Sequence, residues 1–111
     1  MAAALKGTYW QRGESLDYKN DGDTTIEAGT VIVYGERIGI AGCEIAPGEM
    51  GSIHVEGVFG VPKKDEAAIT AGAQLYWHSD GATTTSTSVK IGFAAQAAAA
   101  SDTTVLVKIN A

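Results

Sequence analysis

The amino-acid sequence predicts an all-β fold, a small β-barrel or sandwich of short antiparallel strands preceded by an extended N-terminal arm. Short apolar runs are separated by turn residues about every ten positions, a spacing typical of small β domains. The apolar residues are mostly Ala, Val and Ile, with two Phe, and β-branched side chains favour strands. No segment predicts a long helix. We therefore expect about six to nine short strands in this chain of 111 residues.

The sequence also contains a short internal repeat. In each copy an Ala-Gly turn opens a short apolar strand, a polar turn follows, and the next strand begins with Ile-Gly. A third strand is expected at 53–58 in the first copy and at 105–109 in the second. Repetition of this kind indicates a scaffold that acts through its surface. The matching segments are 26–29, 31–34 and 38–41 in the first copy, and 69–72, 75–77 and 91–94 in the second.

The two copies differ mainly in the turn between their first two strands. This turn is short in the first copy, at Gly35-Glu36-Arg37, whereas a long polar loop runs from His78 to Ser88 in the second. Loops carried on a rigid scaffold are common sites of binding. The sequence therefore indicates that specific contacts lie at the long loop and in the arm.

Three elements are predicted in the first part of the chain. Ser15-Leu16-Asp17-Tyr18 alternates polar with apolar residues, as a half-buried strand does. The segment 20–23 is a turn, because Asn, Asp and Gly tolerate left-handed backbone. Val31-Ile32-Val33-Tyr34 is an apolar strand, and 37–41 is its expected antiparallel partner across a tight turn.

Four further segments complete the expected fold. Residues 52–61 alternate as one strand, which Pro62 ends because proline lacks a backbone N–H donor. The hydroxylic segment 83–88 is expected to form a mobile loop or the tip of an extended hairpin. Segment 94–100 is rich in Ala, so propensity alone favours a helix; the repeat instead favours a strand leading into a loop, with one helical turn as the alternative. Residues 103–109 are expected to close the fold as an edge or barrel strand.

We expect residues 1–13 to form an arm and residues 14–111 to form a single β domain. Tyr9 and Trp10 are large side chains with little apolar sequence around them. They must therefore pack either on the body of the same chain or on a partner.

Charge and cysteine content exclude several classes of protein. The net charge is −5, which argues against a general phosphate-binding surface and hence against nucleic acid as a partner. Lys63-Lys64, followed by two acidic residues, is expected to be a solvated turn.

Cys43 is the single cysteine, so no intrachain disulfide forms, and it is expected to be a small packed side chain. The sequence has no signal-peptide pattern and no apolar run of membrane-spanning length, and a membrane is not expected as a partner.

No motif in the sequence predicts catalysis, a cofactor or a metal site. Gly-x-Ser-x-Gly, phosphate-binding glycine motifs and the spacing of zinc ligands are all absent. The acidic turn at 20–23 lacks the closing Glu of a calcium loop, because the twelfth residue from Asn20 is Val31. His54 is expected to point from a sheet face into solvent, and His78 to lie at a strand end. The sequence therefore predicts a protein that is not an enzyme and holds no cofactor.

The ordered motifs resemble a family of phage and prophage proteins known as capsid cement or head-decoration proteins. The most specific part is Gly48-Glu49-x-Gly51 leading into Val55-Glu56-Gly57-Val58-Phe59-x-Val61-Pro62-Lys63. The likeness continues through 69–77, Ile91-Gly92 and Val105-Leu106-Val107-Lys108. The other matching motifs are Gly13-Glu14-Ser15-Leu16-Asp17-Tyr18, Ile26-Glu27-Ala28-Gly29, Ile38-Gly39-Ile40-Ala41 and Ala46-Pro47.

The resemblance implies a structural role in the virion. Such a protein would be made in the bacterial host cytoplasm, form an oligomer, most simply a homotrimer, and bind the outside of the assembled head. There it would bridge subunits of the major capsid protein and stabilise the lattice.

A surface-displayed module that binds a carbohydrate or a receptor is the alternative function. It would use Tyr76, Trp77 and the hydroxylic loop, because Tyr and Trp present apolar area with a polar edge. Core or subunit packing is the competing role for Trp77. The residues expected to bind partners are Leu5, Tyr9, Trp10, Tyr76 and Trp77.

Overall fold

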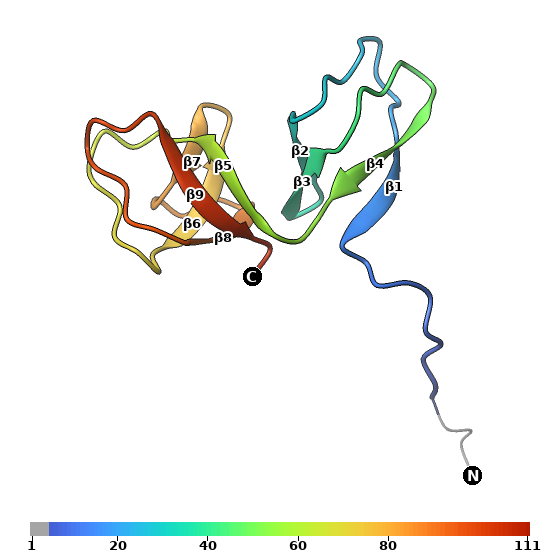
Figure 1. Ribbon diagram of the computed structural model, residues 1–111, viewed down its shortest axis with the longest axis horizontal. Helices are drawn as coiled ribbons and strands as arrows, with labels where there is room; N and C mark the ends of the chain where they lie inside the picture. Colours follow the sequence, from blue (N-terminus) through green and yellow to red (C-terminus); the bar gives the residue numbers. More distant parts are fainter. Residues whose placement is uncertain (1–4) are drawn as a thin grey trace.

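The computed structural model describes residues 5–111, and within them it contains nine strands and no helix. The strands form two antiparallel sheets, so the predicted all-β class is confirmed. The sheets lie side by side and are joined by the segment between β4 and β5 (Figure 1). The first sheet has the strand order β1-β4-β3-β2, with β1 at Ser15–Lys19, β2 at Val31–Tyr34, β3 at Arg37–Ala41 and β4 at Met50–His54.

The second sheet repeats the order of the first and adds one strand. Its order is β5-β9-β8-β6-β7, so β5, β9, β8 and β6 take the places of β1, β4, β3 and β2. The added strand, β7, lies at the edge beside β6. The bounds are Val58–Pro62 for β5, Gln74–His78 for β6, Gly81–Thr83 for β7, Lys90–Ala94 for β8 and Thr104–Ile109 for β9.

The internal repeat is present in the strand register as well as in the strand order. Ser15 pairs with His54 in the first sheet, and Val58 pairs with Lys108 at the matching place in the second. The pairs Ile32–Gly39 and Leu75–Gly92 correspond in the same way between the hairpin strands. The turns match too, because Gly29 N–H donates to Ala41 O and Gly72 N–H donates to Ala94 O, both at 2.7 Å. We therefore define a first repeat, residues 14–55, and a second repeat, residues 57–109.

The repeats have separate but equivalent core residues. In the first repeat, Ile32, Ala41 and Ile53 form a buried cluster on one face of the sheet. Their equivalents in the second repeat, Leu75, Ala94 and Val107, lie in the larger cluster of that half. The strand alternation explains this placement, because alternate residues of β2, β3 and β4 face the same side.

The two repeats are held together by the other face of β3. Ile38 and Ile40 are buried in the cluster of the second repeat, together with Ile91 and Ile109. The central strand of the first sheet therefore supplies apolar side chains to both cores, and it joins the two sheets by burial of apolar area.

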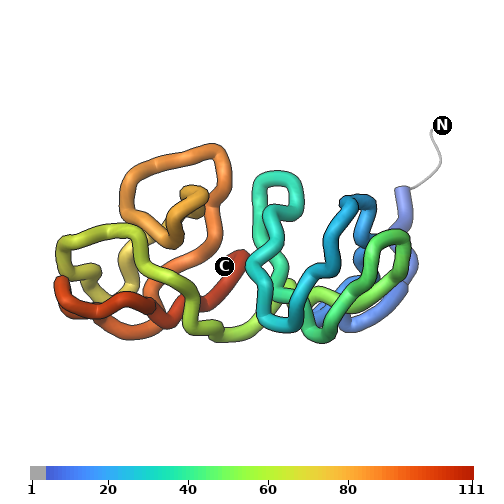
Figure 2. Tube along the Cα trace, turned by 90° about the horizontal axis from the view of Figure 1, so that it is seen from above, coloured from blue at the N-terminus to red at the C-terminus, as the bar shows by residue number. Residues whose placement is uncertain are grey.

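Asn110 adds a polar connection at the same place. Its side-chain oxygen accepts from Ile38 N–H at 3.2 Å, and its side-chain nitrogen donates to Ile38 O at 2.8 Å and to Val55 O at 2.9 Å. The side-chain amide thus replaces a neighbouring strand along this part of β3. Asn110 has a φ of 58°, a left-handed conformation that Asn tolerates better than most residues. The C-terminal end consequently lies between the two sheets (Figure 2).

The structure corrects two of the predicted strands. The expected single strand over 52–61 is two strands, β4 and β5, because the chain leaves the first sheet at 55–57 and enters the second. Gly57, with a φ of 122°, allows this change of direction. Residues 104–109 form an interior strand, β9, between β5 and β8, so of the two expected alternatives, an edge strand or a barrel strand, the edge strand is wrong.

Three local environments also differ from the sequence prediction. Cys43 is exposed rather than packed. Lys63, expected in a solvated turn, is only 9 % exposed, and its ammonium donates to Asp65 O at 2.6 Å and to Ala100 O at 3.3 Å. His54 is half-buried: its Nδ1 lies 3.1 Å from Ser15 Oγ, and its ring stacks on Phe59.

The expected strand end and loop at 94–100 are confirmed, because β8 ends at Ala94 and turns follow. The first residue of the hydroxylic segment 83–88, Thr83, is buried and belongs to β7.

We predict that Asn110→Asp destabilises the protein by about 2 kcal/mol, because it places a carboxylate oxygen against the carbonyls of Ile38 and Val55. Asp and Asn side chains have nearly the same shape, so the loss of stability measures the loss of the hydrogen bonds. Urea unfolding at neutral pH measures it. Asn110→Gly is the matched control for the backbone, since Gly keeps the left-handed conformation and lacks only the amide. An unfolding midpoint of Asn110→Asp equal to that of the unmodified chain would contradict the role of Asn110.

Candidate functional site

The predicted partner-binding residues before β1 are exposed. Leu5 is 100 %, Tyr9 is 79 % and Trp10 is 88 % exposed, and residues 5–14 have no strand or helix. This segment leads away from both sheets in Figure 1. Three large apolar side chains in water are costly unless another surface covers them. The arrangement therefore suits contact with a partner, which stays a prediction for these residues.

Tyr76 and Trp77 are neighbours on β6 and project from opposite faces of the sheet. Trp77 is half-buried and packs against the core of the second repeat. Tyr76 lies on the other face, where it lines a cleft together with residues 86–88 of the long loop. The structure thus brings Tyr76 to the hydroxylic loop and separates it from Trp77.

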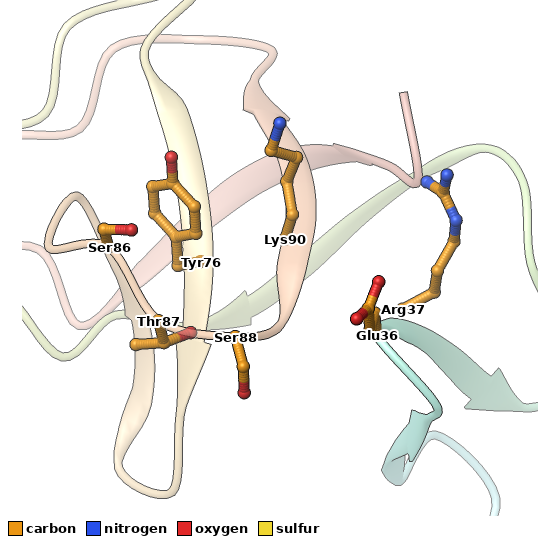
Figure 3. Close-up of a pocket in the computed structure, with 7 residues that line it drawn as sticks. All are labelled: Glu36, Arg37, Tyr76, Ser86, Thr87, Ser88 and Lys90. Atoms are coloured by element: carbon orange, nitrogen blue, oxygen red, sulfur yellow. The ribbon is translucent and has the colours of Figure 1, made fainter.

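The cleft lies between the two repeats and has a volume of about 460 Å³ (Figure 3). Its first-repeat residues come from the tight turn after β2 and the start of β3. Its second-repeat residues come from β6, the long loop and the start of β8. The lining residues are Glu36, Arg37, Tyr76, Ser86, Thr87, Ser88 and Lys90.

Arg37 and Lys90 occupy equivalent positions in the two repeats. Arg37 precedes Ile38-Gly39 at the start of β3, and Lys90 precedes Ile91-Gly92 at the start of β8. The repeat predicted from the sequence includes Ile-Gly but not the cation that precedes it in each copy. A cation directly before Ile-Gly in both copies is the sequence signal that could have identified Arg37 and Lys90. That both residues line one cleft depends on how the two sheets pack.

The hydroxylic segment 83–88 of the long loop is attached to the body of the second repeat at its beginning. Asp65 accepts hydrogen bonds from the Thr83 hydroxyl at 2.6 Å, and from the backbone N–H and hydroxyl of Thr84, both at 2.9 Å. Near its end, Thr87 Oγ1 donates to Trp77 O at 2.9 Å. These bonds hold segment 83–88 near both of its ends and so position Ser86 and Ser88 at the cleft.

The charge of Asp65 is stabilised by these contacts. Burial alone would raise the pKa of Asp65, but the hydrogen bonds from Thr83 and Thr84, together with the charge of Lys64, lower the pKa below its ordinary value of 3.8. The carboxylate therefore stays ionised, and remains a hydrogen-bond acceptor, to lower pH than usual.

The described residues contain no group of three His, Cys, Asp or Glu side chains placed to bind a metal ion. His78 Nδ1 lies 3.6 Å from Asp80 in an exposed turn. No helix in residues 5–111 is long and apolar enough to cross a membrane.

The described chain is thus a duplicated all-β body with exposed apolar side chains ahead of its first strand. The chain belongs to the phage cement protein family, whose model matches residues 10–109. The family resemblance in the sequence is thereby confirmed, and a capsid-associated structural role follows from it. Comparisons with curated proteins and with solved structures give no match.

We predict that acid destabilises the unmodified chain more than Asp65→Asn. The lowered pKa of Asp65 means that its contribution is complete above about pH 3.8 and is lost as the pH falls through the still lower pKa of the folded state. Asn at this position cannot titrate. Melting temperatures measured between about pH 5 and pH 2 test this difference. Parallel curves for the two proteins would show that Asp65 does not stabilise the fold through its charge.

Proposed function

We propose that this protein binds the outside of an assembled phage head and stabilises the lattice of the major capsid protein. The observation that carries the proposal is the family match over residues 10–109. Exposed Leu5, Tyr9 and Trp10 support it, because they offer apolar area that a capsid surface would cover.

The proposed assembly is a homotrimer on the virion surface. A capsid lattice presents many identical sites. An oligomer that binds several of them at once attaches firmly even if each single contact is weak. A trimer would place three copies of the N-terminal segment around one site. Light scattering of the purified protein tests this state, and a monomer at micromolar concentration would count against it.

Carbohydrate binding is the second candidate function. Tyr76 and the hydroxyl-bearing loop line one cleft, which favours it. The packing of Trp77 against the core removes the second aromatic ring that such a site was expected to use. A glycan array with no bound sugar would exclude this candidate.

Co-sedimentation with expanded heads that lack the protein tests the main proposal. We expect saturable binding at micromolar concentration, and protein that stays in the supernatant at every concentration would contradict it.

We predict that deletion of residues 1–12 leaves the two sheets folded and weakens binding to heads. Residues 5–12 contribute no strand to either sheet, and they carry the exposed side chains of Leu5, Tyr9 and Trp10. Co-sedimentation measures binding, and circular dichroism verifies the fold. The double variant Val33→Ala/Tyr34→Ala is the matched control, because it removes exposed apolar area from β2 instead. If the deletion binds heads as well as the complete chain does, the segment has no role in attachment.

A further inference from the structure

The cleft between the repeats gathers two cations from different parts of an acidic chain. Arg37 belongs to the first repeat and Lys90 to the second, and both line the same cavity. In Figure 3 the Lys90 ammonium and the Tyr76 hydroxyl point in the same direction, and Arg37 stands on the opposite side of Lys90 from Tyr76. The net charge of the whole chain is −5, so the cleft, with its two cations, differs in charge from the chain as a whole.

Neither cation forms an ion pair with another side chain of the described residues. The ion pairs within residues 5–111 are Arg12–Glu14 and His78–Asp80, so Arg37 and Lys90 take part in none. Arg37 Nη1 donates one long hydrogen bond, at 3.4 Å, to Asn110 O. Most of the guanidinium donors and the ammonium therefore remain available to a ligand.

The charge of the cleft indicates the class of ligand. Arg37 and Lys90 contribute two positive charges and Glu36 one negative charge, which leaves one positive charge for a ligand to balance. A single carboxylate matches that charge and can accept from the guanidinium, the ammonium and the nearby hydroxyls. A doubly charged phosphate would exceed it and would also be repelled by Glu36.

The size and openness of the site favour a segment of protein over a free small acid. A volume of about 460 Å³ exceeds the space that one carboxylate needs, and Glu36, Arg37 and Lys90 are all exposed. Exposed ion pairs are individually weak, so a useful contact here needs additional interactions along the ligand.

We propose that this cleft binds an acidic segment of a partner protein, with one carboxylate of that segment held between Arg37 and Lys90. The inference goes beyond the proposed capsid function and does not depend on it, because it concerns binding by the isolated protein.

Titration with the acetylated, amidated peptide Gly-Gly-Glu-Gly, which carries a single carboxylate, is followed by NMR and tests the proposal on the complete chain. We expect chemical-shift changes at residues 36–37, 76 and 86–90, a dissociation constant of about a millimolar, and weaker binding as salt is added. The peptide Gly-Gly-Gln-Gly, which has the same backbone and no charge, should cause none of these changes. Shifts confined to other parts of the chain would overturn the proposal, and so would inorganic phosphate that binds the cleft as tightly as the peptide.

Three variants test which side chains of the cleft determine peptide binding. Arg37→Gln/Lys90→Gln should weaken binding of the Glu-containing peptide about tenfold, because it removes the attraction, and Glu36→Gln should strengthen it, because it removes a repulsion. Lys6→Gln/Lys19→Gln is the matched control, since it changes the net charge equally at exposed positions outside the cleft. Equal affinities for the two double variants would refute the site.

Discussion

The packing of β3 against the second repeat is the interaction on which the rest of the structure depends. Ile38 and Ile40 enter the core of the other half, and the Asn110 amide satisfies the backbone of Ile38 at the same strand. Apolar burial provides the attraction, while the directed hydrogen bonds fix the position of one sheet relative to the other. The cleft exists because of this junction, since it is lined from both sides of it.

Duplication explains how a short chain acquires two sheets with the same strand order. The equivalent pairs in each repeat preserve the core, so changes between the copies fall where packing does not constrain them. The connection after β2 consists of Gly35 and Glu36 before β3 begins, whereas residues 79–89 separate β6 from β8 and include β7. That insertion supplies the loop wall of the cleft, and Asp65 attaches it to the body. The two repeats thus share one scaffold and differ at one edge of the sheet, where the second repeat carries the insertion.

Much of the fold could be predicted from local patterns, because strands and turns depend on neighbouring residues. The hairpin of β2 and β3 and the internal repeat are confirmed in the structure. The break between β4 and β5 at 55–57 was not predicted, because the alternation of polar and apolar residues continues through it. The strand ends there only because the chain passes from one sheet to the other. The burial of Lys63 depends on its contact with Ala100, and the cleft depends on segments far apart in sequence that line it together, such as those of Arg37 and Lys90. The division into an arm and one β domain, and the binding role of Leu5, Tyr9, Trp10, Tyr76 and Trp77, stay predictions.

The central proposal is that this member of the phage cement protein family binds a phage head and strengthens it. The most direct measurement is the temperature at which DNA-filled heads lacking the protein release their DNA, with and without a saturating amount of it. If the protein bridges capsid subunits, the release temperature rises with occupancy and reaches a plateau when the sites are full. Heads that bind the protein to saturation and yet release DNA at an unchanged temperature would contradict this account.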